Sequence, residues 1–511
     1  MSPILREKLQ ERKRRISERL GRRPASGTGK PVLSGGNIHY EISDRVHAIA
    51  PGGLGAVHLM AQKIGLVDGI NKNVHVLKRH VPYMESDHIL NISLNIMAGG
   101  KRLEHIELLR NDEVYLDALG AERIPDPTTE GDFCRRFNEF HIQLLMDAIN
   151  EARLRVWKQQ PPEFFDEAVI DVDGTIAPTD SWCKEGIDIA YNGQWGYHPL
   201  LVSLANTGEP LYLVNRSGNR PSQEDAHQYI DRTVALCRKA GFRLITLRGD
   251  TKFSQTTYVD GWNQPDIRFL FGMDSMPNLV ELAGNLPVED FELLERPIGY
   301  EIKTAPRQRR PRVRAEIVKK RRFKNTETYE EAVAEFPYCP GACKEPYRMI
   351  VLRKRLIVTE GQMYLFEEYR YFFFITNDWS KPATELVLEA NQRCDQENLI
   401  AQLKGGVGAM TMPVDTLESN WAYMVMAGLA WSLKAWVALL MPVESLGSVE
   451  QKAEKRKLLR MEFATFRAAV IQIPCQIVRT AGRLVFRLLS WNPWQASIFR
   501  LVDWLHTCRL C

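Results

Sequence analysis

Residues 167–175 are EAVIDVDGT, an apolar stretch that ends in two aspartates, a glycine and a threonine. A short apolar run of this kind is typical of a buried strand. Asp171 and Asp173 lie at its end, and because side chains alternate along a strand, both should point to the same face. The stretch therefore predicts a strand whose carboxyl end presents carboxylates.

The elements around this strand follow an order that predicts an α/β core. Pro161 and Pro162 break the chain before it, and Asp250 follows a later strand. The predicted elements are an amphipathic helix at 222–240 and strands at 196–204, 211–215, 243–247 and 267–273. Strand, hairpin, helix and strand in this order place carboxylates at the ends of two separate strands.

From about Ile49 to Gln159 the chain has a helical pattern. We predict one long amphipathic helix that starts at Asp126 and runs through Phe133, Phe137, Leu144 and Ile149. Two interpretations are open for this region: a helix-turn-helix DNA reader and a helical dimer module.

The chain after residue 300 changes character twice. Residues 301–355 interrupt the α/β order with a basic run and a predicted strand at 347–353. Residues 364–376 are rich in aromatic and β-branched side chains and predict another strand. Helical character returns at Ala383 and ends at Gly405.

The net charge of +4 hides two concentrated basic runs. Residues 6–30 hold ten Lys and Arg against three Glu, and residues 303–324 hold eleven against Glu316 alone. Such runs predict contact with a polyanion, with a solvated tail and a solvated loop as the alternative.

Length and composition predict several folded units: the chain has 511 residues, of which 44% are hydrophobic and 25% charged. The nine cysteines are scattered. With no hydrophobic signal sequence at the amino end, they favour a reducing cytoplasm over a disulfide framework. The stretch Trp421–Met441 is strongly apolar but contains a lysine, which predicts a buried helix and no membrane span.

A third carboxylate, Glu397, lies on the predicted helix that begins at Ala383. Arg393 and Lys404 lie four residues before it and seven residues after it, which places all three within about 40° on one helical face. Alone, this face is ordinary as a surface ladder of ion pairs. Joined with the two acidic strand ends, it has a second interpretation as part of a metal site.

Three carboxylates from two strand ends and a helix can hold two Mg²⁺ ions in the oxygen coordination that this ion prefers. A metal pair of this kind activates water or a 3′-hydroxyl and stabilises the leaving oxygen when a phosphodiester is displaced. Arg393 and Lys404 would then contact the phosphates that flank the scissile bond.

Taken together, the motifs resemble those of the DDE transposases of bacterial insertion sequences. IDVDGT and LRGDTKF are similar to the settings of that family's first two aspartates. Arg393-x3-Glu397-x6-Lys404 matches the last three terms of the subgroup signature Y-x2-R-x3-E-x6-K, whereas Ala390 occupies the tyrosine position. The resemblance extends over most of residues 50–440 through GGLG, SDHIL, AGGKRLEHIELLR, GYHPL and RSGN.

The resemblance implies Asp173, Asp250 and Glu397 as catalytic residues and as ligands of two Mg²⁺ or Mn²⁺ ions. Asp171, Arg393 and Lys404 would support them, and Asp171 could substitute for Asp173. The implied DNA contacts are Arg309, Arg310, Arg312, Arg314, Lys319, Lys320, Arg321, Arg322 and Trp379. For Trp379, burial in the core is the favoured alternative.

The implied architecture is a ribonuclease H-like catalytic core, interrupted by a β-rich insertion and preceded by a helical domain. We expect a basic arm at 1–40, a helical DNA-binding or dimerisation region at 41–160, the first part of the core at 161–300, the insertion at 301–380, the second part of the core at 381–445 and a C-terminal helical region at 446–511. The implied partners are double-stranded DNA, as terminal inverted repeats and as target, and a second copy of the chain in the synaptic complex. The implied location is on DNA in the bacterial cytoplasm, away from any membrane.

Two alternatives compete with this interpretation. DVDGT also matches the first motif of haloacid dehalogenase-like phosphatases, with Asp171 as nucleophile and Asp173 as acid/base. That fold opens with this motif, whereas here about 165 residues precede it, and no later acidic pair completes the set. A DNA-binding relative without catalysis would account for the basic runs but not for the three carboxylates.

Overall fold

The computed structural model of the protein describes residues 2–21, 39–40, 46–80, 82–296, 313–360, 363–443, 448–480 and 482–508. Its α-helices are α1 (Pro3–Gly21), α2 (Leu54–Lys63), α3 (Leu66–Asn73), α4 (Glu85–Ala98), α5 (Ile106–Arg110), α6 (Glu113–Leu119), α7 (Pro127–Cys134), α8 (Glu139–Trp157), α9 (Ala226–Ala240), α10 (Thr256–Trp262), α11 (Pro277–Gly284), α12 (Val313–Arg321), α13 (Ala383–Asn391), α14 (Cys394–Ala401), α15 (Leu417–Leu439), α16 (Ser448–Arg460), α17 (Phe463–Phe466) and α18 (Gln495–Thr507). Its strands are β1 (Ala48–Ile49), β2 (Glu167–Gly174), β3 (Ala177–Pro178), β4 (Asp188–Ile189), β5 (Trp195–Tyr197), β6 (Leu200–Leu204), β7 (Glu209–Val214), β8 (Leu244–Gly249), β9 (Ile267–Met273), β10 (Glu292–Leu293), β11 (Lys324–Tyr338), β12 (Tyr347–Glu360), β13 (Met363–Thr376), β14 (Cys475–Thr480) and β15 (Arg483–Leu488).

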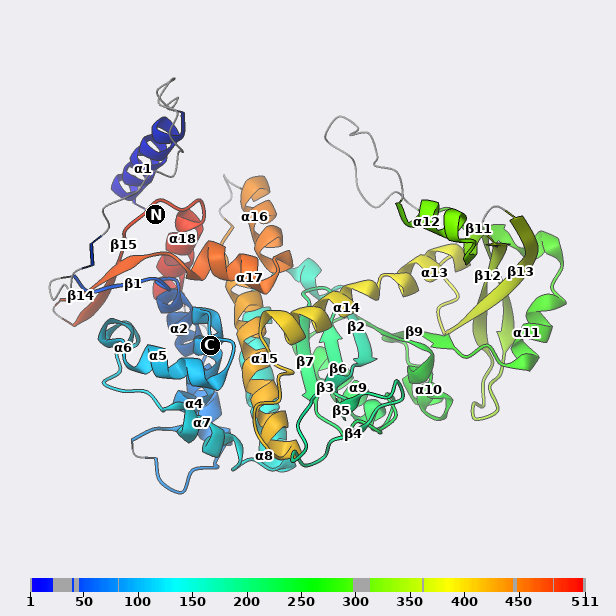
Figure 1. Ribbon diagram of the computed structural model, residues 1–511, viewed down its shortest axis with the longest axis horizontal. Helices are drawn as coiled ribbons and strands as arrows, with labels where there is room; N and C mark the ends of the chain where they lie inside the picture. The colour runs from blue at the N-terminus through cyan, green and yellow to red at the C-terminus, as the bar shows by residue number, and fades with distance from the viewer. Residues whose placement is uncertain are drawn as a thin grey trace.

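A nine-stranded mixed sheet runs through the middle of the molecule in the order β10-β11-β12-β13-β9-β8-β2-β6-β7 (Figure 1). β2, β8 and β9 are parallel neighbours, and the other pairs are antiparallel. The predicted α/β class is therefore correct. The strand that contains Asp173 also lies directly beside the strand that precedes Asp250.

Helices pack against the β2–β6–β7 part of this sheet, in which every residue of β6 and β7 is buried. α9 packs against β2, β6 and β8, while α8 and α15 pack against β7. α9 offers the sheet a stripe at helical spacing, formed by Tyr229, Ile230, Thr233, Val234 and Cys237.

α15 is the central core helix, as the sequence predicts. Among the described residues it is the one helix long and apolar enough to cross a membrane, and its whole apolar window is buried inside the protein. The side chain of Thr416 caps its first turn, accepting a hydrogen bond from the backbone N–H of Ser419. α15 packs against α4, α8 and β7, so burial explains its apolar character.

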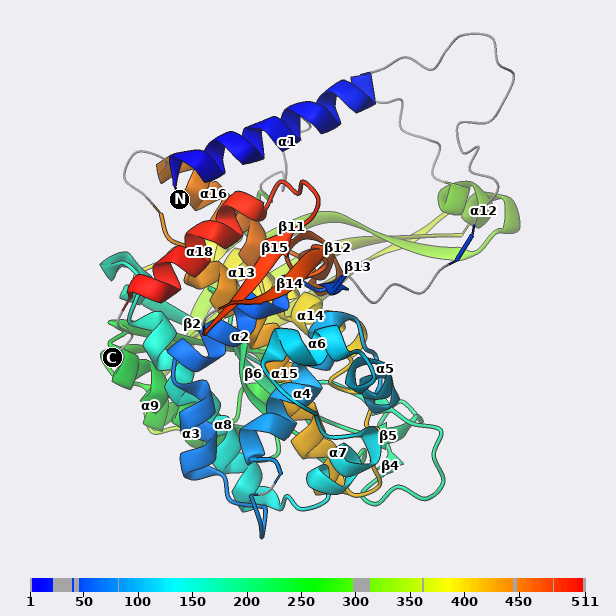
Figure 2. The same ribbon diagram turned by 90° about the vertical axis from the view of Figure 1, so that its left-hand side faces the viewer.

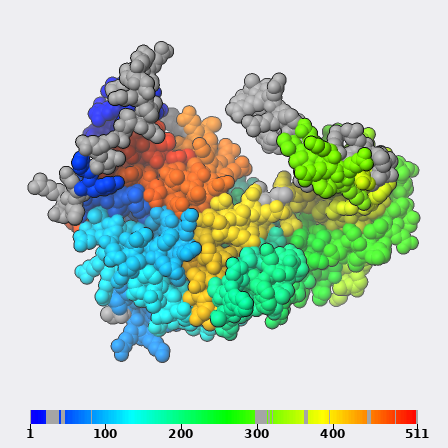
Figure 3. Space-filling view, viewed as in Figure 1, coloured from blue at the N-terminus to red at the C-terminus, as the bar shows by residue number. Residues whose placement is uncertain are grey.

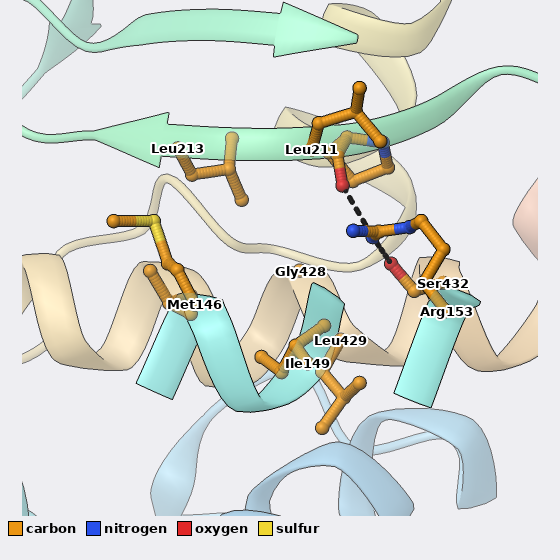
Figure 4. A pocket seen from close by; sticks show the side chains of 10 residues that line it. Met146, Ile149, Arg153, Leu211, Leu213, Gly428, Leu429 and Ser432 are labelled. Atoms are coloured by element: carbon orange, nitrogen blue, oxygen red, sulfur yellow. Dashed lines mark hydrogen bonds between the residues drawn. The ribbon is translucent and has the colours of Figure 1, made fainter. Parts of the chain in front are cut away.

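A buried ion pair joins α8 to β7 beside α15. The Arg153 guanidinium donates to the Glu209 carboxylate at 3.0 Å, to the Pro210 carbonyl at 2.7 Å and to the Ser432 hydroxyl at 3.2 Å. Figure 4 shows this arginine at the edge of a small cavity of about 20 Å³, next to Leu211. Trp157 and Trp436 donate to the same carboxylate, so its charge is well satisfied.

The prediction of one long helix from Asp126 to Ile149 is wrong, because the chain forms two helices, α7 and α8. The side chain of Asn138 accepts a hydrogen bond from the backbone N–H of His141, which begins a new helix at Glu139. Phe133 and Phe137 nevertheless pack edge to face with 5.2 Å between their ring centroids. The apolar spacing is thus kept across the break, which explains why the sequence resembles one helix.

The two ends of the described chain meet on one side of the molecule (Figures 1 and 2). β1, near the amino end, pairs with β14, which pairs with β15. One continuous apolar core runs from Ile49 to Leu505. α1 lies apart from this core and has no buried residue; it is tied to β15 by a hydrogen bond of 2.8 Å from Arg12 to the Leu488 carbonyl.

β11, β12 and β13 extend the sheet away from the core. α13 covers one face of this extension, where Leu386 and Val387 pack with residues of β9, β11 and β12 in a second apolar cluster. α12 lies near its far end (Figure 2). In Figure 3 the surface is hollowed above the yellow segment that contains α13 and α14, between the orange C-terminal segment and the lime α12.

Candidate active site

Two acidic strand ends lie side by side at the centre of the sheet. β2 and β8 run parallel, with Asp171 opposite Arg248 and Val172 opposite Gly249. Asp173 is therefore near the carboxyl end of β2, and Asp250 follows the end of β8. Parallel neighbours bring their carboxyl ends to one edge, which is where ligands bind in α/β sheets.

The local sequence after each strand suits a tight turn. A Cβ on Gly249 would lie 2.6 Å from the Cβ of Phe253, and a Cβ on Gly174 would lie 3.0 Å from Nε2 of His198. A side chain at Gly249 would therefore clash with Phe253, and one at Gly174 would press against the His198 ring. Asp250 itself starts a short turn of helix by accepting a 2.8 Å hydrogen bond from the backbone N–H of Lys252.

The third predicted carboxylate comes from a different element. α13 ends at Asn391, the chain turns at Gln392 and Arg393, and α14 then carries Glu397 on its exposed side. The predicted continuous helix from Ala383 to Gly405 is thus interrupted. The adjacent Gln396 points inward and is buried, with its amide nitrogen 3.4 Å from the Leu201 carbonyl of β6.

The structure brings the three predicted carboxylates into one electrostatic neighbourhood. The pKa of Asp173 is raised to about 6, chiefly by burial and in part by the negative charges of Asp250 and Glu397, while the Arg393 cation opposes the rise. Arg393 forms an ion pair with Asp173, with 3.4 Å between Nη2 and Oδ2. The region combines like charges with one compensating cation.

Lys404 follows the carboxyl end of α14, in a short π-helix at Gln402–Gly406. Burial lowers its pKa. Burial also lowers the pKa of His198, and the cations of Arg216 and Lys404 act in the same direction. His198 is the neighbour of Gly174 described above, so the charge of Lys404 acts on a side chain beside the end of β2.

Sequence reasoning did not assign roles within the GYHPL and RSGN motifs, and the structure gives them one. His198 of the first motif contacts the Arg220 carbonyl through Nδ1 at 2.8 Å. Arg216 of the second donates to the carbonyls of His198 and Glu224 at 3.0 and 2.8 Å. These bonds tie the two motifs together beside Gly174, next to the first acidic strand end.

Asp171 does not share the setting of Asp173. Its side chain is 1% exposed and accepts two hydrogen bonds from Arg248, at 2.8 and 2.9 Å. A nucleophile must reach a substrate phosphate, and this carboxylate is held inside the protein by a guanidinium. The arrangement leaves the phosphatase interpretation of DVDGT without its nucleophile.

Among the residues that the structure describes, no three His, Cys, Asp or Glu side chains lie close enough together to hold a metal ion. Asp173, Asp250 and Glu397 therefore lie near one another without forming a ligand set. Cys339 and Cys343 are free thiols, and within the described part of the chain they too belong to no group of three such side chains.

The predicted DNA contacts fall into three groups. Arg309, Arg310 and Arg312 lie outside the described residues, and Arg314 and Lys319 belong to α12. Lys320, Arg321 and Arg322 are exposed at the end of that helix. Trp379 is 59% exposed, so the favoured expectation that it is buried in the core is wrong. An exposed indole remains available for a partner.

The protein thus has an α/β fold with two acidic residues at adjacent strand ends. A third acidic residue, Glu397, lies on the nearby helix α14. The family model for the transposase DDE domain, group 1, matches residues 47–510. The chain therefore belongs to this family of DDE transposases, which act on DNA.

Comparison with solved structures finds a weaker likeness. A cryo-EM structure of a piggyBac transposase synaptic complex with hairpin DNA is 11% identical, with a TM-score of 0.37, over 82% of this chain and 81% of that one. Among curated proteins no sequence matches.

Proposed function

We propose that the protein cuts DNA at the ends of a bacterial insertion sequence and transfers the freed 3′-hydroxyls to target DNA, with Asp173, Asp250 and Glu397 as its catalytic carboxylates. The observation that carries this proposal is the grouping of three carboxylates from two strand ends and a separate helix. The charges of Asp250 and Glu397 act on Asp173 and raise its pKa. Membership in the DDE transposase family supports the same assignment.

In their chemistry, though not in the spacing that the structure shows, the three carboxylates suit a hard divalent cation. The three side chains offer only carboxylate oxygens, which Mg²⁺ and Mn²⁺ prefer, and an anionic group whose charges repel one another is stabilised by a cation. When bound, two such ions would supply an activated attacking oxygen and stabilise the leaving oxygen. Asp173, Asp250 and Glu397 would hold them, while Arg393 and Lys404 would bind the neighbouring phosphates.

The architecture proposed for this activity is a ribonuclease H-like core at 161–300 and 381–445, with residues 301–380 inserted between its second and third carboxylates. The sheet order supports it, because β11–β13 join the sheet at its β9 side, away from β2. The basic end of α12 and the exposed Trp379 are the proposed DNA contacts. The two ends of the insertion sequence must be processed together, so a dimer of the protein is proposed for the synaptic complex.

The test is a cleavage assay on DNA with the inverted repeats that flank the gene, in Mg²⁺ or Mn²⁺. Asp173→Ala, Asp250→Ala and Glu397→Ala should each lower the cleavage rate by at least about 10³-fold while end binding persists. Asp166→Ala is the matched control, because Asp166 lies at the other end of β2 in an exposed pair with Arg243. A wild-type chain that binds the repeats but never cuts them would show a non-catalytic relative.

A further inference from the structure

We propose that Arg248 is a positioning residue that holds the end of α13 on the sheet and so places α14, which carries Glu397, beside the two acidic strand ends. The proposal rests on the function proposed above for Glu397. It assigns the first aspartate of DVDG a role as the anchor of this arginine, away from the reacting atoms.

Arg248, at the centre of the sheet, bonds to two other elements. Its side chain is 4% exposed, and two of its nitrogens donate to the two carboxylate oxygens of Asp171, the residue opposite it in register. Its Nη1 donates at 3.0 Å to the backbone carbonyl of Glu389. One rigid guanidinium thus links β2, β8 and the last turn of α13.

The held carbonyl lies just before the turn that sets the direction of α14. Glu389 is two residues from the end of α13, and the chain turns at Gln392 and Arg393 before Glu397. The Glu389 carboxylate is also held, by Lys381 at 2.7 Å. Arg393, in the turn, reaches Asp173 at 3.4 Å. The end of α13 is therefore fixed on the same two strands that carry the acidic ends.

A second contact holds the start of α14 to the sheet. The amide nitrogen of Gln396 lies 3.4 Å from the Leu201 carbonyl and from the Ser203 hydroxyl. In register, Leu201 lies opposite Asp173 and Ser203 lies opposite Asp171. Glu397 thus follows Gln396, which is anchored beside β2. Arg248 fixes α13, the helix that precedes the turn.

A buried ion pair is a poor means of gaining stability, because desolvation offsets most of its attraction. Apolar residues at 171 and 248 would fill the same space, but they could not hold the Glu389 carbonyl. Lysine at 248 would keep the charge without the planar fork that serves the carboxylate and the carbonyl together. Arginine at position 248 can bind the Asp171 carboxylate and the Glu389 carbonyl at the same time, and these two contacts place α14.

Arg248→Lys is the test variant, and Arg153→Lys is its matched control. Arg153 also pairs with a buried carboxylate and donates to a carbonyl, but it does so between α8 and β7 (Figure 4). Asp171→Asn is a second test variant, because it weakens the same ion pair by changing the partner of Arg248. The proposal can therefore be tested even if one of the two variants folds poorly. Hydrogen exchange of the backbone is followed in residues 383–401, together with inverted-repeat binding and the single-turnover cleavage rate in Mg²⁺ and Mn²⁺.

With Arg248→Lys or Asp171→Asn, exchange in residues 383–401 should accelerate by about tenfold or more, and cleavage in Mg²⁺ should slow by about 10- to 100-fold with end binding retained. Mn²⁺ should recover part of the rate, because Mg²⁺ demands stricter ligand geometry. The control should leave exchange in residues 383–401 and the Mn²⁺-to-Mg²⁺ ratio unchanged.

Unchanged exchange in residues 383–401 would overturn the positioning role, as would an equal effect of Arg153→Lys. The exchange comparison needs no activity, so it decides the role of Arg248 even if the wild-type chain fails to cut DNA. Failure of wild-type cleavage would overturn the proposed function alone.

Discussion

Asp171 and Asp173 are two residues apart on one strand but differ in their surroundings. Asp171 is buried against Arg248, whereas Asp173 pairs with Arg393 and feels the charges of Asp250 and Glu397. Asp171→Asn leaves a buried guanidinium without its counter-charge, so we expect the free energy of unfolding to fall by about 3 kcal/mol. Urea denaturation measures this loss. Asp166→Asn, in an exposed pair, should cost less than about 1 kcal/mol; equal losses would contradict the burial argument.

Asp173 should make the stability of the metal-free protein depend on pH. Burial raises its pKa from 3.8 to about 6, so the folded chain binds this proton more tightly than the unfolded chain. Its favourable contribution is full below about pH 3.8 and is lost as the pH rises through about 6. At pH 8 the ionised carboxylate should cost on the order of 2–3 kcal/mol.

The measurement is urea denaturation of the wild type and Asp173→Asn, in EDTA, from pH 4 to pH 8. The advantage of the variant should grow between about pH 4 and pH 6 and then level off. Asp166→Asn, at the exposed end of the same strand, serves as the control. A difference between Asp173→Asn and wild type that stays constant across this range would show that Asp173 titrates normally.

At the residue scale, the sequence contains the three carboxylates but not the contacts that distinguish them. Alternation along β2 predicts that Asp171 and Asp173 point the same way, yet it says nothing of what they meet. Arg248 appears in LRGDTKF as a cation beside a catalytic candidate. Its pairing with Asp171 and with the Glu389 carbonyl joins three distant segments, which no local pattern encodes.

At the scale of elements, some strands were predicted closely and others were not: the strand predicted at 196–204 is wrong, because it is divided between β5 and β6 in two sheets, and β11 was not predicted. β2, β8, β9 and β13 lie within a few residues of their expected bounds, because apolar runs of this length leave few alternatives. The breaks at Asn138 and at Gln392 were missed. At both places the apolar period continues across the break, and the first depends on a side-chain cap and the second on tertiary contacts.

The end of α12 should contribute to DNA binding through charge. Lys320, Arg321 and Arg322 are exposed there, and Arg322 has a φ of 55°, a left-handed conformation that ends the helix and turns the chain into β11. Changing the three to Gln should make the slope of log K against log salt shallower by about 2–3. Binding isotherms at several salt concentrations measure it.

The matched control for α12 removes three cations elsewhere. Arg238, Lys239 and Arg243 lie in and after α9, and each is paired with a carboxylate. Their change to Gln should leave the salt slope unaltered. If both triple variants lose the same slope, net charge and not the position of α12 governs binding.

At the scale of the whole molecule, the sequence predicts separate regions, whereas the apolar core is continuous. The pairing of β1 with β14 and the close approach of Gly53 to the Val470 carbonyl join the two ends of the chain. Contacts between segments so far apart in sequence have no local signature. The α/β centre was predictable because its elements follow one another along the chain.

α1 gives a test of how far DNA binding and folding are separable in this molecule. It carries seven cations and three Glu, buries no residue and meets the core through Arg12. Deleting residues 2–21 should therefore leave the unfolding temperature within about 1–2 °C of wild type, because little apolar surface is lost. The affinity for inverted-repeat DNA should fall, and the salt slope should become shallower by about 2 or more.

A variant with the α1 cations changed to Gln separates charge from length. It keeps the helix, since Gln is a good helix former, and it should reproduce the loss of affinity and of salt slope. Calorimetry and DNA titration on both variants give the two readouts. A deletion that lowers the unfolding temperature by many degrees would place α1 in the folding unit; an unchanged salt slope in both variants would remove it from the DNA contacts and leave α12 as the remaining candidate.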